Sequence, residues 1–243
     1  MKLNICHLYP DVLNLYSDAG NVLCLKQRLL WRGIDCEVTE LPLGAKADFN
    51  QFDLFFLGGG QGFQAAALLK DLKAGKLHEI IAAIEDERVF LAICGGFQLL
   101  GEYFVTTAGE QIDYIGALPL HTIDSETRMT GNCRFSCSPE NGGFDVVGFE
   151  NHSGKTYLNS GLAPLGKVIK GFGNNGEDGT EGARYKNVFA SYSHGPLLPK
   201  NPQLADEILK IALNRRHPGA ELQPLDDTIE NTAHDYMSAR LSK

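Results

Sequence analysis

The segment RVFLAICGGFQ, residues 88–98, joins an apolar run to the start of a helix-like stretch, and it decides the fold. Arg88–Ile93 is apolar enough to be buried on both faces, as the strands of a covered parallel sheet are. Cys94 follows at once, and the small residues Ala92 and Gly96 flank it, as a tight strand-to-helix turn requires. Open α/β sheets bind their ligands at the carboxyl ends of their strands, where such a turn lies.

The first half of the chain repeats this alternation of strand and helix. Apolar runs of strand length predict strands over Lys2–Leu8, Asp35–Leu41, Asp53–Leu57 and Arg88–Ile93. Helical spacing predicts helices over Asp18–Arg32, Phe63–Lys73, Leu77–Glu87 and Gly96–Phe104. Asp18 is a candidate N-cap of the first of these helices. The alternation predicts an α/β fold with a mostly parallel central sheet covered by helices on both faces.

The second half has a different pattern. From Ile112 to about Ser193, short strand-like stretches alternate with Gly, Asn and Ser turns, which favours antiparallel additions to the parallel core. Leu204–Arg215 returns to a helical pattern. In Leu225–Leu241 apolar residues recur every four positions, which predicts an amphipathic helix. We therefore predict one domain over residues 1–217, followed by a C-terminal helical tail over residues 218–243.

Composition excludes several classes of protein. The 243 residues include 22 Lys and Arg against 30 Asp and Glu, a formal charge of −8, which disfavours nucleic acid or a polybasic membrane surface as the partner. A hydrophobic fraction of 43% is that of a globular chain, and no apolar run is long enough to span a membrane. The start, MKLNICHLYPD, lacks the features of a signal peptide, so we expect a cytoplasmic protein.

Cys94 is the candidate nucleophile. A helix N-terminus directly after the sulfur favours the thiolate, and the backbone N–H of Gly95 can face an oxyanion beside it. The alternative is a structural cysteine at the end of a strand, followed by an incidental pair of glycines. The other cysteines lie in segments typical of small buried hydrophobes. Cys133 and Cys137 lack further ligands at a metal-binding spacing, so we expect no metal site.

A glycine-rich loop, Gly58–Gly62, follows the strand DLFFL and is a second candidate element. Its glycines allow the backbone to approach a ligand closely, and their N–H groups can stabilise an oxyanion. The alternatives are a plain turn or a phosphate-binding loop. Phe63 occupies the place of the third glycine of a dinucleotide fingerprint, and no Walker A sequence is present, so we do not expect nucleotide binding.

His194 is the candidate base. It ends the strand-like run NVFASYS and precedes Gly195-Pro196, a position from which a side chain can reach across a cleft. A histidine is often structural, and His121, His152 and His234 remain alternatives for the role of base.

Taken together, these motifs resemble class I glutamine amidotransferases. The order of the glycine loop, AICGGFQLLG and a late His194 is similar to that family, and the Ser-His-Gly-Pro turn is similar to its cobyric-acid-synthase-like (CobB/CobQ-type) branch. Longer segments resemble the GatD family of glutaminase subunits of lipid II isoglutaminyl synthase: NLYSDAGN (14–21), GFENHSGKTYL (148–158) and NNGEDGTEGARYKNVFASYSHGPLLPKNP (174–202). The resemblance covers essentially the whole chain.

The resemblance implies a three-layer, flavodoxin-like α/β domain and a role for each matching residue. Cys94 would be the nucleophile that attacks the glutamine amide, and His194 the base. Gly60 and Gly95 would donate to the oxyanion, and Gln98 would support the glutamine pocket. Arg128 would bind the substrate α-carboxylate, its alternative being an exposed strand arginine.

The resemblance also implies a partner. The glutaminase would form a heterodimer with the Mur-ligase-like subunit MurT, which would use the ammonia to amidate the D-glutamate of the lipid II stem peptide to D-isoglutamine. It would need no cofactor of its own, since ATP, Mg²⁺ and any Zn²⁺ would belong to the partner. Contact with lipid II through the partner would place it at the inner face of the membrane. The alternatives are the glutaminase part of a cobyrinate-type amidotransferase and a non-catalytic subunit that stabilises a ligase.

One position departs from the family pattern. Most class I members carry a glutamate two residues after the histidine, where this chain has Pro196. The acid that orients His194 is then absent, elsewhere in the chain, or supplied by the partner. From the sequence we expect a partner carboxylate.

Overall fold

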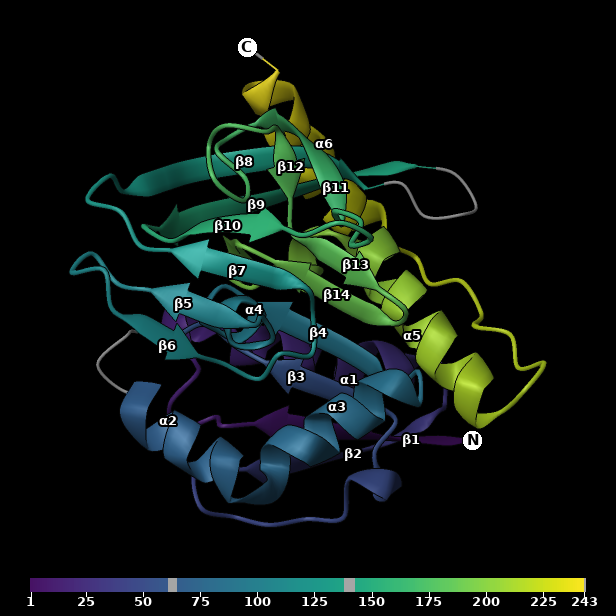
Figure 1. The fold of residues 1–243 in the computed structure, drawn as a ribbon. Coiled ribbons are helices and arrows are strands. Elements are labelled where there is room, and N and C mark those ends of the chain that lie inside the picture. Colours follow the sequence, from purple (N-terminus) through teal and green to yellow (C-terminus); the bar gives the residue numbers. More distant parts are fainter. Residues whose placement is uncertain (61–64, 138–142, 243) are drawn as a thin grey trace.

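A six-stranded sheet forms the centre of the molecule in the computed structural model, which describes residues 1–60, 65–137 and 143–242 (Figure 1). Its strands are β1 (Lys2–Leu8), β2 (Asp35–Leu41), β3 (Leu54–Leu57), β4 (Val89–Ile93), β13 (Ala183–Tyr185) and β14 (Val188–Ser191). The strand order is β13-β14-β4-β3-β1-β2, and only β13 is antiparallel to its neighbour. The predicted α/β fold with a mostly parallel central sheet is confirmed.

Helices cover both faces of this sheet, with α1 and α5 packed together on one face and α2 and α3 on the other (Figure 1). The helices are α1 (Ala19–Trp31), α2 (Ala65–Asp71), α3 (Leu77–Glu85), α4 (Gly95–Leu99), α5 (Pro202–Arg216) and α6 (Thr228–Leu241). Shorter helical turns are η1 (Leu15–Ser17), η2 (Phe49–Gln51), the π-helical η4 (Leu72–Lys76) and η5 (Leu198–Lys200). The start of the helix predicted over Phe63–Lys73 lies outside the described residues.

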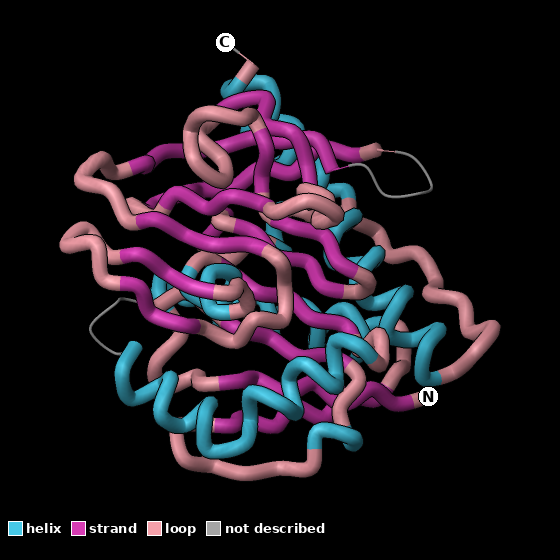
Figure 2. The backbone as a smooth tube through the Cα atoms, viewed as in Figure 1, coloured by secondary structure: helices cyan, strands magenta, loops and turns pink. Residues whose placement is uncertain are grey.

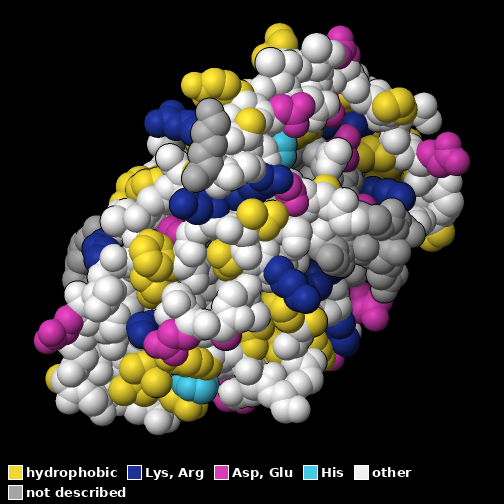
Figure 3. Space-filling view, turned by 90° about the horizontal axis from the view of Figure 1, so that it is seen from above, with side chains coloured by type: hydrophobic (Ala, Val, Ile, Leu, Met, Phe, Trp, Pro, Cys, Tyr) yellow, Lys and Arg dark blue, Asp and Glu magenta, His cyan; other side chains and the backbone are white. Residues whose placement is uncertain are grey.

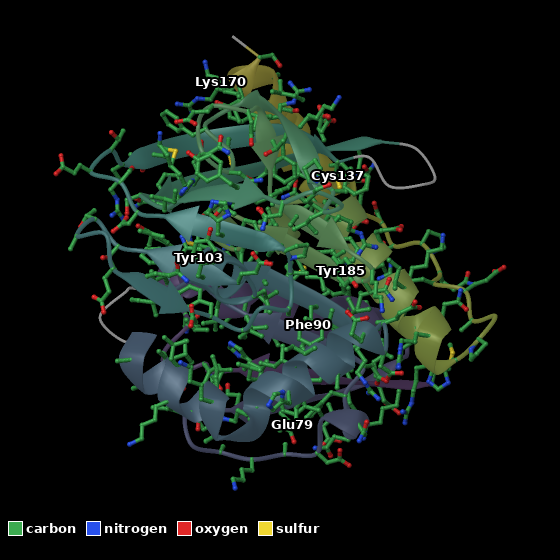
Figure 4. All side chains as sticks on the ribbon, in the orientation of Figure 1. Glu79, Phe90, Tyr103, Cys137, Lys170 and Tyr185 are labelled. Atoms are coloured by element: carbon green, nitrogen blue, oxygen red, sulfur yellow. The ribbon has the colours of Figure 1, made fainter. Side chains whose placement is uncertain are left out.

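The aromatic core lies under these helices. Phe55 of β3 and Phe90 of β4 stack with their ring centroids 4.6 Å apart. Figure 4 shows the Phe90 side chain inside the molecule, whereas Glu79 of α3 lies on the outer side of the helical layer. The near-continuous apolar runs of β3 and β4 therefore mark strands that are buried on both faces.

Two smaller sheets continue the structure beyond the central one (Figure 2). The four-stranded sheet has the order β10-β7-β5-β6, with strands β5 (Tyr103–Val105), β6 (Gln111–Asp113), β7 (Leu120–Ile123) and β10 (Lys155–Leu158). The five-stranded sheet has the order β12-β11-β8-β9-β15, with strands β8 (Met129–Cys137), β9 (Phe144–His152), β11 (Gly166–Lys170), β12 (Thr180–Glu181) and β15 (Ser193–His194). These are mostly antiparallel additions, as predicted.

The helix predicted over Gly96–Phe104 is wrong in its second half. Helix α4 ends at Leu99, and the chain returns as strand β5. A side chain at Gly101 would clash with Leu120, so the chain after α4 lies tight against β7. The aromatic and β-branched residues that follow pair with β6 and β7, where they pack well on a pleated surface.

The C-terminal helix forms, but its predicted apolar stripe is only partly packed: Met237 and Leu241 are half-buried, whereas Ala233 is exposed. Ile229 is 82% exposed. Helix α6 is instead held by polar contacts, since His234 Nδ1 lies 3.0 Å from the carbonyl of Lys200 and Arg134 Nη1 donates to the carbonyl of Ser238 over 3.1 Å. Four-residue spacing drifts around a helix of 3.6 residues per turn, so it did not mark one buried side.

The surface carries charges of both signs. Seen from above, basic, acidic and hydrophobic side chains are interspersed over the visible face, with no continuous acidic patch among the coloured residues (Figure 3). None of the helices in the described part of the chain combines the length and apolar character needed to cross a bilayer. The predicted division after residue 217 stays a prediction.

Candidate active site

Cys94 lies on a strained turn between β4 and α4. Its backbone has φ 48° and ψ −102°, a conformation that a non-glycine residue adopts only when its surroundings enforce it. The Cys94 N–H donates to the carbonyl of Ser191 over 2.8 Å, which ties the turn to β14. A side chain at Gly96 would lie 2.7 Å from the carbonyl oxygen of Leu57, so the turn tolerates no larger residue there. The sulfur therefore stands at the carboxyl end of the parallel sheet, as the sequence predicts.

The glycine loop after β3 lies directly beside this turn. A Cβ added to Gly95 would lie 2.8 Å from the backbone nitrogen of Gly60, so the two backbones are in contact. A Cβ on Gly59 would come within 2.5 Å of His194 Cε1, and glycine is therefore required under the imidazole. Gln61 and Gly62, the rest of the predicted loop, lie outside the described residues.

His194 reaches this place on strand β15, which pairs with β9 opposite Phe149. Its Nδ1 lies 3.1 Å from Oδ2 of Asp18, and both side chains are fully buried. Asp18 Oδ2 also accepts the N–H of Gly59 over 2.9 Å. The chain thus carries its own carboxylate at His194, contrary to the expectation that a partner would supply one.

His194 is held in its charged form. Burial lowers the pKa of His194, but hydrogen bonding and charge from Asp18 and Cys94 raise it by more, to about 10. Contact with the Asp18 carboxylate therefore favours the charged imidazolium. Its Nε2 is buried and makes no hydrogen bond of ordinary geometry with the described residues.

A cavity of about 590 Å³ opens beside Cys94. It brings together four of the residues singled out from the sequence: Cys94, Gly60, Gln98 and Arg128. Residues that the sequence did not assign to the site also line it: Tyr16, Tyr114, Asp124, Asn151 and Ser153. A cavity of this size accommodates a small organic substrate.

Two polar residues in the cavity wall are fixed by neighbours. Gln98 Nε2 donates to the Tyr192 hydroxyl over 2.9 Å. Arg128 Nε donates to Asn151 Oδ1 over 2.5 Å, and the Asn151 amide in turn bonds the Tyr16 hydroxyl. These bonds orient both side chains before any ligand is present.

Asp124 adds a negative charge to the same cavity. Its Oδ1 accepts from the Ser153 hydroxyl over 2.7 Å. Burial, together with the Asp124 charge, raises the pKa of Tyr114, which lines the same cavity, to about 12. An arginine and an aspartate in one cavity suit a ligand that carries both a negative and a positive group.

The three alternative histidines occupy other surroundings. His121 stacks between Tyr103 and Tyr157, with centroid distances of 5.0 and 5.5 Å. His234 lies on α6, bonded to a carbonyl of η5. His152 does line the cavity, but its Nδ1 bonds the carbonyl of Gly154 over 2.8 Å and its ring stacks on Tyr192. His194 contacts both the acid and Cys94.

Comparisons with known proteins agree with this geometry. Residues 4–202 match the CobB/CobQ-like glutamine amidotransferase domain. The chain is 41% identical over 225 residues to the GatD subunit of lipid II isoglutaminyl synthase (glutamine-hydrolyzing) from Streptococcus pneumoniae, covering 91% of this chain and 84% of that one. It is 38% identical over 242 residues to the same subunit from Staphylococcus aureus, covering 100% and 97%.

The fold is also similar to that of solved structures. A glutamine amidotransferase from Thermotoga maritima superposes with a TM-score of 0.56 at 14% identity, over 98% of this chain and 92% of that one. At that identity the likeness shows the fold alone. With the domain match and two relatives that each span most of the chain, the chain belongs to the CobB/CobQ-like glutamine amidotransferases and, among them, to the GatD subunits of lipid II isoglutaminyl synthases.

Proposed function

We propose that this chain is a glutaminase subunit, which hydrolyses glutamine to glutamate and passes the ammonia to an ATP-dependent ligase subunit. The ligase would amidate the α-carboxylate of D-glutamate in the lipid II stem peptide to D-isoglutamine. One observation carries the proposal: Cys94, on its strained turn, lines a cavity and interacts with the buried His194, whose Nδ1 lies 3.1 Å from the Asp18 carboxylate. The names of the relatives, which are subunits of a glutamine-hydrolysing synthase that acts on lipid II, support the choice of substrate and assembly.

In the first chemical step, the Cys94 thiolate attacks the side-chain amide carbon of glutamine and forms a carbon–sulfur bond. The backbone N–H groups of Gly60 and Gly95 stabilise the resulting oxyanion. When the tetrahedral intermediate collapses, the carbon–nitrogen bond breaks and His194 gives its proton to the leaving ammonia. A thioester between Cys94 and the glutamyl group remains.

In the second step, water hydrolyses that thioester. Neutral His194 takes a proton from the attacking water, the carbon–sulfur bond breaks, and glutamate leaves with the thiolate restored. The sum is glutamine and water converted to glutamate and ammonia. No bound metal or nucleotide takes part in these steps, and we assign ATP and Mg²⁺ to the ligase subunit.

The cavity suits the amino-acid end of glutamine. We assign the α-carboxylate to the guanidinium of Arg128 and the α-ammonium to the carboxylate of Asp124. Gln98, fixed by Tyr192, supports the wall between these groups and Cys94. The partner subunit is Mur-ligase-like and the pair is a heterodimer in the cytoplasm, which meets lipid II through the partner at the inner face of the membrane.

The test is glutamate release by the full chain with Cys94 replaced by Ala or Ser. We expect loss of hydrolysis with an unchanged melting temperature, since only the sulfur is removed and the turn keeps its bonds. Cys36→Ser, in β2 at the far side of the sheet, is the matched control and should keep wild-type turnover. A Cys94→Ala chain that hydrolyses glutamine at the wild-type rate would refute the proposal, and a wild-type chain without turnover, alone and with the ligase subunit, would indicate a non-catalytic subunit.

A further inference from the structure

Position 196, where most class I members carry a glutamate, holds a tightly packed proline in this chain. Pro196 follows His194 and Gly195, and its ring lies on Gly20 at the start of α1, where a side chain would clash with it. The loop after His194 therefore rests directly on the N-terminus of α1. The residue that precedes α1, Asp18, is brought to Nδ1 of the His194 imidazole.

Asp18 is free for this contact because another residue caps the helix. The Asp18 side chain makes no hydrogen bond to the first turn of α1. Asn14 takes that role, and its Oδ1 accepts the N–H of Ala19 over 2.9 Å. A strong capping residue directly before a helix ordinarily bonds the helix itself. Here it points instead to His194 and the glycine loop.

The backbone directly before Asp18 has a strained conformation. Tyr16 and Ser17 have φ values of 55° and 60°, two consecutive non-glycine residues in the left-handed region. Such strain costs free energy and persists where the surroundings enforce it, often at functional sites. The Tyr16 ring packs edge-on against the His194 ring with centroids 5.1 Å apart. The imidazole is therefore in contact with both Tyr16 and Asp18.

The buried carboxylates of Glu181 and Glu150 accept hydrogen bonds from groups other than His194. Glu181 accepts from the Ser191 hydroxyl and from the N–H of Tyr192. Glu150 accepts the N–H groups of Phe172 and Gly173. Among the described residues, Asp18 is the carboxylate bonded to His194.

We infer that Asp18 is the positioning acid of this site, whose carboxylate holds the His194 imidazole at Nδ1 and so presents Nε2 to the substrate beside Cys94. The inference rests on the proposed function and deepens it. A carboxylate at Nδ1 fixes the ring orientation and stabilises the imidazolium. Asp18 Oδ1 is buried without a hydrogen-bond partner in the described part of the chain, so His194 is the counter-charge in contact with this carboxylate.

The first test compares Asp18→Asn with wild type in the full chain. Asn is isosteric and its oxygen can still accept the Gly59 N–H, so the fold should persist while the charge is lost. We expect kcat to fall at least about tenfold, and up to ten-thousandfold as when the acid of a serine-protease triad is changed to its amide. Asp35→Asn is the matched control, because Asp35 is exposed at the amino end of β2, opposite the site, and it should leave kcat unchanged.

The pH dependence of kcat/KM distinguishes a positioning role of Asp18 from a merely structural one. The groups that face His194 are Asp18, Cys94 and the Tyr16 ring, and the Lys200 ammonium contributes charge near Asp18. Loss of the Asp18 charge lowers the pKa of His194, so the alkaline limb of kcat/KM should move to lower pH. Wild-type kcat with an unmoved limb in Asp18→Asn would overturn the inference.

A second measurement does not depend on how well an Asp18 variant folds. In the Cys94→Ala chain, Asp18 remains as the charge in contact with His194. Titration of His194 by NMR should then give a pKa above 6.5, the ordinary value for histidine, because the carboxylate is still present. A value at or below 6.5 would overturn the inference even if Cys94→Ala has lost all glutaminase activity. Retained glutaminase activity of that variant would instead refute the proposed function.

Discussion

Arg128 is held in place before substrate arrives, since its Nε is bonded to Asn151 in the cavity wall. Its Nη atoms make no hydrogen bond or ion pair within the described part of the chain, so they can receive a carboxylate. Arg128→Ala should therefore raise the KM for glutamine by about tenfold to a hundredfold, as expected when a charge-assisted bond is lost, and change kcat less.

The matched variant for Arg128 is Asp124→Asn, which removes the opposite charge of the cavity. We expect it to raise the KM for glutamine as well, but not the KM of an analogue that lacks the α-amino group. An analogue without the α-carboxylate should bind Arg128→Ala and wild type alike. A full Arg128→Ala deficit with that analogue would contradict the carboxylate contact.

At the level of single residues, sequence reasoning succeeded where a residue type and a local turn were enough. Cys94, Gly60, Gln98 and Arg128 do lie around one cavity. Asp18 was assigned to a helix cap because its local context before α1 favours that role. The signal that could have revealed it is Asn14, a second capping residue that leaves Asp18 without a helix bond to make.

Strand β12 carries a buried acid, Glu181, that makes stability depend on pH. Burial and the nearby Glu150 raise its pKa from 4.5 to about 7, although bonds from Ser191 and backbone N–H groups oppose the shift. The folded chain therefore binds a proton there more tightly than the unfolded chain. This contribution to stability is complete below pH 4.5 and is lost as the pH rises through 7. Its upper size is about 3 kcal/mol.

Glu181→Gln should remove that pH dependence, since the amide is neutral throughout. Urea unfolding across the same pH range should show a free energy of unfolding that falls less steeply for Glu181→Gln than for wild type. Glu79→Gln, on the exposed side of α3, should follow the wild-type curve. Parallel curves for Glu181→Gln and wild type would show that Glu181 keeps an ordinary pKa.

Among the helices and strands, the first four strands of the central sheet were predicted well, whereas the end of α4 and the packed face of α6 were not. β1 and β2 begin and end where their apolar patterns do. Helix α4 is shorter than predicted because Gly101 must pass close to Leu120, a tertiary contact that no local pattern contains. The packed face of α6 was missed for the same reason, since it is chosen by β8, β9 and η5 rather than by the helix itself.

For the molecule as a whole, the described site draws Asp18, Cys94, His194 and the cavity from one chain. We therefore expect the isolated full-length chain to release glutamate and ammonia from glutamine at a measurable rate without a ligase subunit. Addition of the ligase subunit should leave the loss caused by Asp18→Asn in place. An isolated chain that becomes active only with its partner would show that the partner contributes a group to the site.

The pairing of Asp18 with His194 has a consequence for synthesis of the protein. The two residues are 176 positions apart in the chain. At a translation rate of about 5–20 residues per second, His194 is made roughly 9–35 seconds after Asp18. Strand β14, which fills the place between β4 and β13, is made just before it. A nascent chain therefore holds Cys94 long before it holds the imidazole and its acid together, and it cannot release ammonia until most of the polypeptide has left the ribosome.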